Sequence, residues 1–197
     1  MAKQIIVIQG GDSFNTYKEY ISSLKNWEVT IDKFRHYKDW KVTLPQKLGK
    51  SYDVLMPRMP NKTNARYEEW KIWFERMFPF LNGEVILIGH SLGGMFLAKY
   101  LAENDFPKRI KKLFLIASPH NRTEDIGDFL LPKSLKKISE QTKNIYLFHS
   151  KDDPSVPFSE LAAFRKQLPK AKAIIFKDRG HFNQKEFPEL IRLIKQQ

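Results

Sequence analysis

The sequence predicts an α/β protein: a three-layer α/β/α sandwich with a mostly parallel sheet of about six strands, in one domain over residues 1–197. Short apolar runs alternate along the chain with amphipathic segments, the pattern of a parallel sheet covered by helices. The runs at residues 85–88 and 113–116 are almost continuously apolar, which is typical of strands buried on both faces. A chain of 197 residues is long enough for one substantial core.

The elements follow in order from this alternation. Strands are expected at residues 4–9, 52–56, 84–89, 112–117, 144–149 and 172–176. Helices are expected at about 64–78, 92–103, 159–168 and 187–194. Residues 25–50 show no clear strand pattern and are compatible with a short helix, and residues 119–132 are long for a plain turn.

A further helix is expected after the first strand. Thr16 and Glu19 form a capping-box pattern at its start. The apolar and aromatic residues that follow have the spacing of one helical face, namely Tyr17, Tyr20, Ile21 and Leu24. Apolar stripes of this kind generally face the core, and we expect this one to do so.

The composition narrows the classes of protein. The chain has no Cys, which excludes disulfides, thiolate nucleophiles and thiolate metal sites. No stretch approaches the roughly 20 apolar residues of a membrane helix, and the amino terminus does not resemble a signal peptide. We therefore expect a cytoplasmic protein without a membrane span.

The formal net charge of +12 would attract anions, including nucleic acid. The basic residues are spread along the whole chain, however, and the densest run, at residues 108–112, leads into an expected strand. Because no nucleic-acid-binding pattern accompanies this run, a basic solvated surface is the favoured interpretation. A nucleic-acid partner is therefore not expected.

Glycines mark the chemistry. Of the nine in the chain, several stand at or just after the ends of expected strands, where ligands of open parallel sheets bind. The turn from Gly89 to Gly94 contains G-x-S-x-G between a buried strand and a helix, which predicts Ser91 as a nucleophile on a sharp turn. The N–H of Leu92 would then point at developing negative charge from the start of the helix.

A nucleophilic serine needs a base, and the base needs an orienting acid. In enzymes whose nucleophile stands on a G-x-S-x-G turn of this kind, the triad residues follow along the chain in the order Ser, then Asp or Glu, then His. Asp152 and Asp153 follow the fifth expected strand, and His181 follows the sixth. The D-x-x-V-P pattern that begins at Asp153 favours this residue as the acid and leaves Asp152 as a loop or surface carboxylate.

The other four histidines are less suited to the role of base. His36 precedes most of the sheet, His90 should point away from Ser91, and His120 and His149 are expected at the surface or behind the site. The second oxyanion donor should come from the loop after the first strand, where the N–H of Gly11 is favoured over that of Asp12.

The motifs resemble a known family. The turn at residues 89–93, the segment 152–154 and the segment 180–182 followed by residues 186–190 are similar to those of small serine hydrolases of the retinoblastoma-binding protein 9 and YdeN-like group, in the α/β-hydrolase superfamily. The resemblance implies a minimal α/β-hydrolase fold without a cap domain. Gln9 stands where many members of the superfamily have His before Gly.

The expected function is that of a serine hydrolase cleaving a carboxylic ester or related acyl bond of a small molecule, without cofactor or metal. Candidate substrate contacts are Phe14, Met95, Phe158 and Phe182. Two alternatives stay open: a non-catalytic module that binds a protein partner, and an acyltransferase that uses the same triad.

Overall fold

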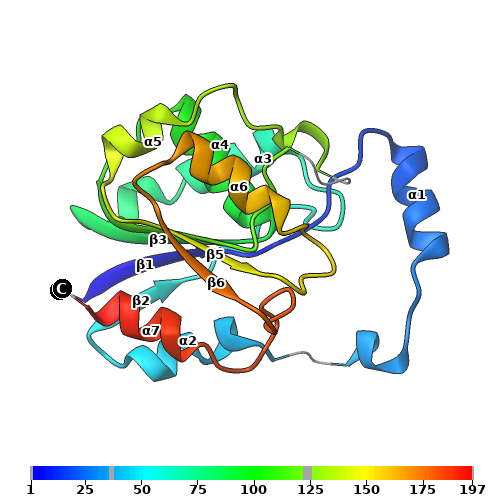
Figure 1. The fold of residues 1–197 in the computed structure, drawn as a ribbon, viewed down its shortest axis with the longest axis horizontal. Coiled ribbons are helices and arrows are strands. Elements are labelled where there is room, and N and C mark those ends of the chain that lie inside the picture. Colours follow the sequence, from blue (N-terminus) through cyan, green and yellow to red (C-terminus); the bar gives the residue numbers. More distant parts are fainter. Residues whose placement is uncertain (1, 36–37, 122–125, 197) are drawn as a thin grey trace.

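The centre of the structure, a computed structural model that describes residues 2–35, 38–121 and 126–196, is a parallel sheet (Figure 1). Its six strands lie in the order β2-β1-β3-β4-β5-β6. They are β1 (Lys3–Ile8), β2 (Tyr52–Leu55), β3 (Glu84–His90), β4 (Arg109–Ile116), β5 (Ile145–Ser150) and β6 (Lys172–Phe176). The predicted α/β fold and its parallel sheet are confirmed, with small shifts at the strand ends.

Helices form a layer on each face of the sheet (Figure 1). One layer contains α3 (Tyr67–Glu75), α4 (Leu92–Glu103), α5 (Lys136–Gln141) and α6 (Ser159–Gln167), and the other contains α2 (Trp40–Leu48) and α7 (Pro188–Lys195). Short 3-10 turns lie at η1 (Ile31–Phe34), η2 (Phe78–Phe80) and η3 (Gly127–Phe129). Helix α5 was not predicted, because six residues with one buried side chain give little periodicity.

Strand β3 shows why the apolar runs are continuous. Val85 and Leu87 belong to the core on the α4 side of the sheet, whereas Ile86 and Ile88 belong to the core on the α2 and α7 side. Successive side chains of a strand point to opposite faces. A strand covered on both faces therefore needs an apolar residue at every position.

Helix α1 (Tyr17–Asn26) corrects one expectation. Its capping box between Thr16 and Glu19 is present, but the helix stands apart from the layers, beyond the end of β1 (Figure 1). None of its residues is buried, and Leu24 is 46% exposed. The expected packing of its apolar face on the core was wrong, because helical periodicity shows which side chains share a face but not what lies opposite.

The carboxyl ends of the six strands meet at one edge of the sheet, since all are parallel. The loops after β1, β3, β5 and β6 therefore converge there. In the described ranges, no helix has the length and apolar character required to cross a membrane.

Candidate active site

Ser91 occupies a strained turn between β3 and α4. Its φ of 55° and ψ of −129° place a non-glycine residue in a region that L-residues rarely adopt. The turn is held on both sides: the Ser91 N–H donates to the Ile116 carbonyl at 2.9 Å, and the Ser91 carbonyl accepts from the Gly94 N–H at 2.9 Å. The side chain is thereby fixed at the carboxyl edge of the sheet.

The glycines around Ser91 are required by close packing. A Cβ on Gly93 would lie 2.3 Å from the Ile8 carbonyl oxygen, and one on Gly89 would lie 2.5 Å from the Gly94 Cα. Both contacts are with backbone, which has little freedom to move aside. This packing explains why G-x-S-x-G is needed at a turn wedged between two strands.

Asp153 and His181 meet across the loops after β5 and β6. The His181 Nδ1 lies 3.0 and 2.9 Å from the two carboxylate oxygens of Asp153, whose side chain is wholly enclosed. The Asp153 Oδ1 also accepts the N–H groups of Ser155 at 2.9 Å and Val156 at 3.0 Å. The D-x-x-V-P pattern is thus a turn in which the chain's own amides orient the carboxylate.

The loop that carries His181 is supported by α2. The Trp40 indole N–H donates to the Phe182 carbonyl at 2.9 Å, and the Trp40 N–H donates to the Gln184 carbonyl at 2.9 Å. The backbone on both sides of His181 is left-handed, with φ of 50° at Gly180 and 54° at Phe182. This strained loop therefore depends on its packing partners to keep its shape.

His90 also supports this loop. Its Nε2 lies 2.8 Å from the His181 carbonyl oxygen, and the two rings are 4.9 Å apart. Burial, followed by the nearby charge of Lys41, lowers the pKa of His90 well below its usual value. His90 is therefore a buried neutral group that contacts the His181 backbone rather than a surface residue.

A polar hollow of about 310 Å³ lies over these groups. Both Ser91 and His181 line it, although no hydrogen bond joins their side chains in the described structure. Such contacts are often loose in the absence of substrate. Lys41, which also lines the hollow, is buried and pairs with Asp39 at 2.5 Å. Burial lowers the pKa of Lys41, and the Asp39 carboxylate opposes this effect.

The two expected oxyanion donors lie at the same hollow or beside it. Gly11 and Asp12 both line it, but the Asp12 N–H already donates to the Lys62 carbonyl at 2.9 Å. The Leu92 N–H belongs to the first turn of α4, where amides have no partner within the helix. Gly11 and Leu92 are thus better placed than Asp12 to donate to a ligand.

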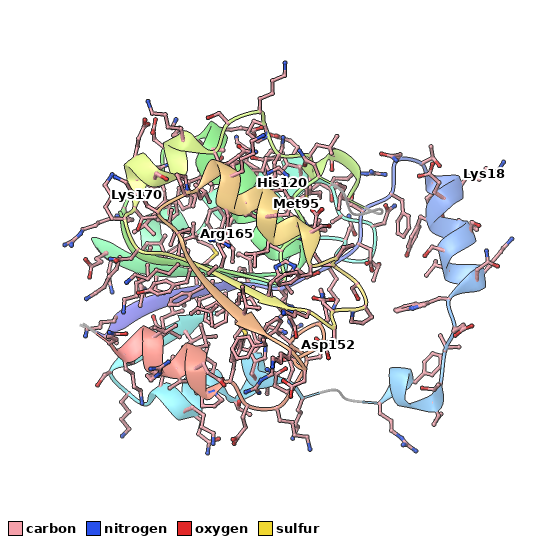
Figure 2. The ribbon with its side chains drawn as sticks, viewed as in Figure 1. Lys18, Met95, His120, Asp152, Arg165 and Lys170 are labelled. Carbon is pink, nitrogen blue, oxygen red and sulfur yellow. The ribbon has the colours of Figure 1, made fainter. Side chains whose placement is uncertain are left out.

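Asp152, which is labelled in Figure 2, has a different set of partners from Asp153. Its Oδ1 accepts the Ser150 hydroxyl at 2.5 Å and the Gly180 N–H at 2.9 Å, so it ties together the loops that carry Asp153 and His181. The hydrogen bond from Ser150 lowers the pKa of Asp152.

Neither His120 nor His149 is among the residues that line the hollow. His120 lies over the Phe164 ring, and His149 is buried beside Phe158. His36 lies outside the described residues.

The four expected substrate contacts need correction. Met95 and Phe182 are fully buried in the two cores, and Phe14 is 6% exposed. Phe158 packs against the α4-side core, and none of the four lines the hollow around Ser91. Proximity in sequence to a strand end was a poor guide, because the side chains at such turns alternate between the cleft and the core.

Residues that the sequence did not suggest line the hollow instead, namely Lys41, Ser155 and Asn183. Ser155 and Asn183 adjoin the expected acid and base, which is a local signal. Lys41 carries none, because it reaches the site through the docking of α2. Within the described ranges, no group of three or more His, Cys, Asp or Glu side chains is arranged to hold a metal ion.

The parallel sheet with a strained serine between β3 and α4 places the protein in the α/β-hydrolase fold class. The YdeN product of B. subtilis superposes with a TM-score of 0.72 at 20% identity, covering 98% of this chain and 97% of that one. A meta-cleavage product hydrolase from Pseudomonas fluorescens IP01 superposes with a TM-score of 0.66 at 15% identity, over 98% and 89% of the two chains.

Within this class the chain belongs to the serine hydrolase family, which matches residues 33–193. It is 32% identical over 158 residues to serine hydrolase RBBP9 of Rattus norvegicus, covering 73% of this chain and 77% of that protein. The family expected from the motifs is confirmed.

Proposed function

We propose that this serine hydrolase cleaves a carboxylic ester through an acyl-enzyme intermediate, with Ser91 as nucleophile, His181 as base and Asp153 as orienting acid. The observation that carries the proposal is the enclosed Asp153 carboxylate bound to His181 Nδ1 beside the strained Ser91. A carboxylate on Nδ1 holds the proton on that nitrogen, so Nε2 is left free to accept one.

The reaction begins when the Ser91 Oγ attacks the acyl carbon and His181 Nε2 takes the hydroxyl proton. The Leu92 and Gly11 N–H groups donate to the oxyanion as charge develops there. His181 then gives its proton to the leaving alcohol, and the acyl group remains on Ser91. Water, deprotonated by the same His181, attacks the acyl carbon; the bond to the Ser91 Oγ then breaks, His181 returns the proton to Oγ, and the carboxylic acid is released.

The first test is labelling with a fluorophosphonate probe, followed by mass spectrometry of the modified peptide. We expect modification of Ser91 in the unaltered protein and none in Ser91→Ala. Ester hydrolysis should fall by a factor of about 10³ or more in Ser91→Ala, because the remaining groups only bind and polarise the substrate. Ser155→Ala, which removes another hydroxyl from the hollow, is the matched control and should still be labelled.

Failure of the folded protein to react with the probe would contradict an activated serine and would favour a module that binds a protein partner. An acyltransferase would label equally well. It is distinguished by products, because an added alcohol or amine would then receive the acyl group at the expense of hydrolysis.

The absence of cysteine favours a cytoplasmic location, which fractionation of the source cells would test.

A further inference from the structure

Three hollows that share lining residues extend from Ser91 to the edge strand β2. The hollow over Ser91 shares Gln9 and Gly10 with a second hollow of about 370 Å³. That second hollow shares Pro57 and Arg58 with a third, of about 460 Å³. The three hollows therefore follow one another from the catalytic edge of β1, past the end of β2, to α3. We call the second and third hollows together the edge groove.

The far end of the edge groove is apolar. The side chains that line it there come from the end of β2 and the residue after it, from α3 and from the turn after α3, namely Leu55, Met56, Trp73, Met77 and Phe80. Trp73 is 45% exposed and Phe80 is 77% exposed. Large apolar side chains that gather at an open groove are typical of a binding site for an apolar group.

The charged residues of the edge groove all carry the same sign. Arg58, Lys62 and Arg76 line it, and no acidic residue is among its lining residues. Arg58 and Arg76 are exposed, and neither guanidinium has a hydrogen bond or ion pair with any described residue. An apolar groove with unpaired arginines complements a ligand that is apolar along its length and carries an anionic group.

The position of His181 decides which half of an ester enters the groove. His181 must protonate the leaving alcohol, so the alcohol lies beside His181. The groove begins instead at Gly10, on the loop after β1. A Cβ on Gly10 would lie 2.8 Å from the Ser91 Cβ, so the Gly10 backbone packs directly against the serine at the start of the groove. The acyl half is therefore the part that points along the groove.

We propose that the edge groove binds the acyl half of the substrate, and that this acyl group is an extended apolar chain carrying an anionic group. The apolar chain lies against Trp73 and Met77, and Arg58 with Arg76 holds the anion. This inference rests on the proposed ester hydrolysis and adds the substrate class to it.

The test uses three p-nitrophenyl esters, so that the leaving group stays constant: the acetate, the octanoate and the mono-ester of octanedioic acid. We expect kcat/KM to rise about tenfold or more from acetate to octanoate, because the added methylenes are buried in the groove. We expect a further rise of about tenfold for the octanedioate ester, because its free carboxylate meets the arginines.

Matched variants separate the groove from general effects. Trp73→Gln should reduce the octanoate-to-acetate ratio several-fold, whereas Ile72→Gln, the exposed neighbour on α3 that does not line the groove, should not. The double variant Arg58→Gln with Arg76→Gln should abolish the preference for octanedioate. The control double variant Arg165→Gln with Arg192→Gln removes the same amount of charge from α6 and α7, and it should keep the preference for octanedioate. Thermal melts check that each variant is folded.

The outcomes distinguish the two proposals. If Ser91 reacts with fluorophosphonate and the acetate is cleaved, but the ratios are flat or are unchanged by the groove variants, the edge groove is not the acyl site and the proposed hydrolysis stands. If Ser91 does not react, the proposed hydrolysis fails and the acyl assignment fails with it.

Discussion

The adjacent carboxylates after β5 contact different groups, and this difference predicts different effects of mutation. Asp153 binds the His181 ring, whereas Asp152 binds backbone and a serine hydroxyl. Asp153→Asn should lower kcat by about 10⁴, because an amide can donate to Nδ1 and favour the tautomer without a free Nε2.

Asp152→Asn should lower kcat much less, because the hydrogen bonds it loses only shape the loop. Steady-state kinetics of the two variants on one ester checks this order. Equal losses, or a larger loss at position 152, would contradict the choice of Asp153 as the acid.

His90 predicts a dependence of stability on pH. Its pKa is lowered in the folded protein, chiefly by burial, so the unfolded chain binds a proton at a pH where the folded protein does not. Stability is therefore present above the unfolded pKa of about 6.5 and is lost as the pH falls toward the lower folded value. The loss from this group is at most about 1.4 kcal/mol per pH unit.

Denaturant unfolding at pH 7.5 and pH 5 measures this loss, and His90→Gln should make it smaller. His149, whose pKa is also lowered mainly by burial, contributes in the same direction and leaves part of the dependence in the variant. A variant that loses as much free energy of unfolding as the unaltered protein would show that His90 is not the titrating group.

At the scale of whole elements, α4 and α1 differ in what they contribute to stability. Leu97 of α4 is fully buried in the core, whereas Leu24 of α1 is 46% exposed. Leu97→Ala should lower the free energy of unfolding by about 2–5 kcal/mol, since it leaves a cavity. Leu24→Ala should change it by no more than about 0.5 kcal/mol.

The shift in denaturant midpoint measures both effects, provided that the slope of the transition stays the same. A loss of several kcal/mol in Leu24→Ala would mean that α1 packs on the body of the protein in solution.

Helix α2 makes long-range contacts that its local sequence pattern does not predict. It lies in the stretch of the sequence with the weakest helix or strand pattern. Even so, Trp40 holds the loop of His181 by a hydrogen bond, and Asp39 forms an ion pair with the buried Lys41. The residues joined by the Trp40 hydrogen bond are 142 positions apart in the chain. No periodicity or turn signal reports a contact over such a separation.

The net charge of +12 is a property of the whole molecule. The structure shows which groups the basic side chains of the densest run, residues 108–112, contact. Arg109 and Lys111 pair with Glu84 at 3.0 and 3.4 Å, and Lys112 is buried and donates to the Leu193 carbonyl. Three of the four basic side chains of this run therefore have partners within the chain.

We expect any binding of duplex DNA at low salt to disappear at about 150 mM salt, where exposed charges are screened beyond roughly 8 Å. A gel-shift titration in increasing salt checks this expectation. A complex that persists at physiological salt would contradict the view that the charge is a solvated surface.

The sequence by itself determined the alternation of strands and helices and the sharp turn at Ser91. It also placed Ser91, Asp153 and His181 after three strands in the order of the proposed serine, acid and base. These features are local, because they depend on side-chain periodicity, on glycine at a crowded turn and on residues that directly follow a strand. It also identified the family, since the motifs that carry the chemistry are short and specific.

Only the tertiary structure decided that α1 stands away from the core, that Met95 and Phe182 are packing residues and that α2 supports His181. It also decided that two hollows with shared lining residues lie between Gly10 and Trp73. Each of these depends on which distant segments meet when the sheet is assembled. The physical reason is that burial and cavity shape are properties of packed surfaces, and a local pattern specifies only one of the two surfaces that pack.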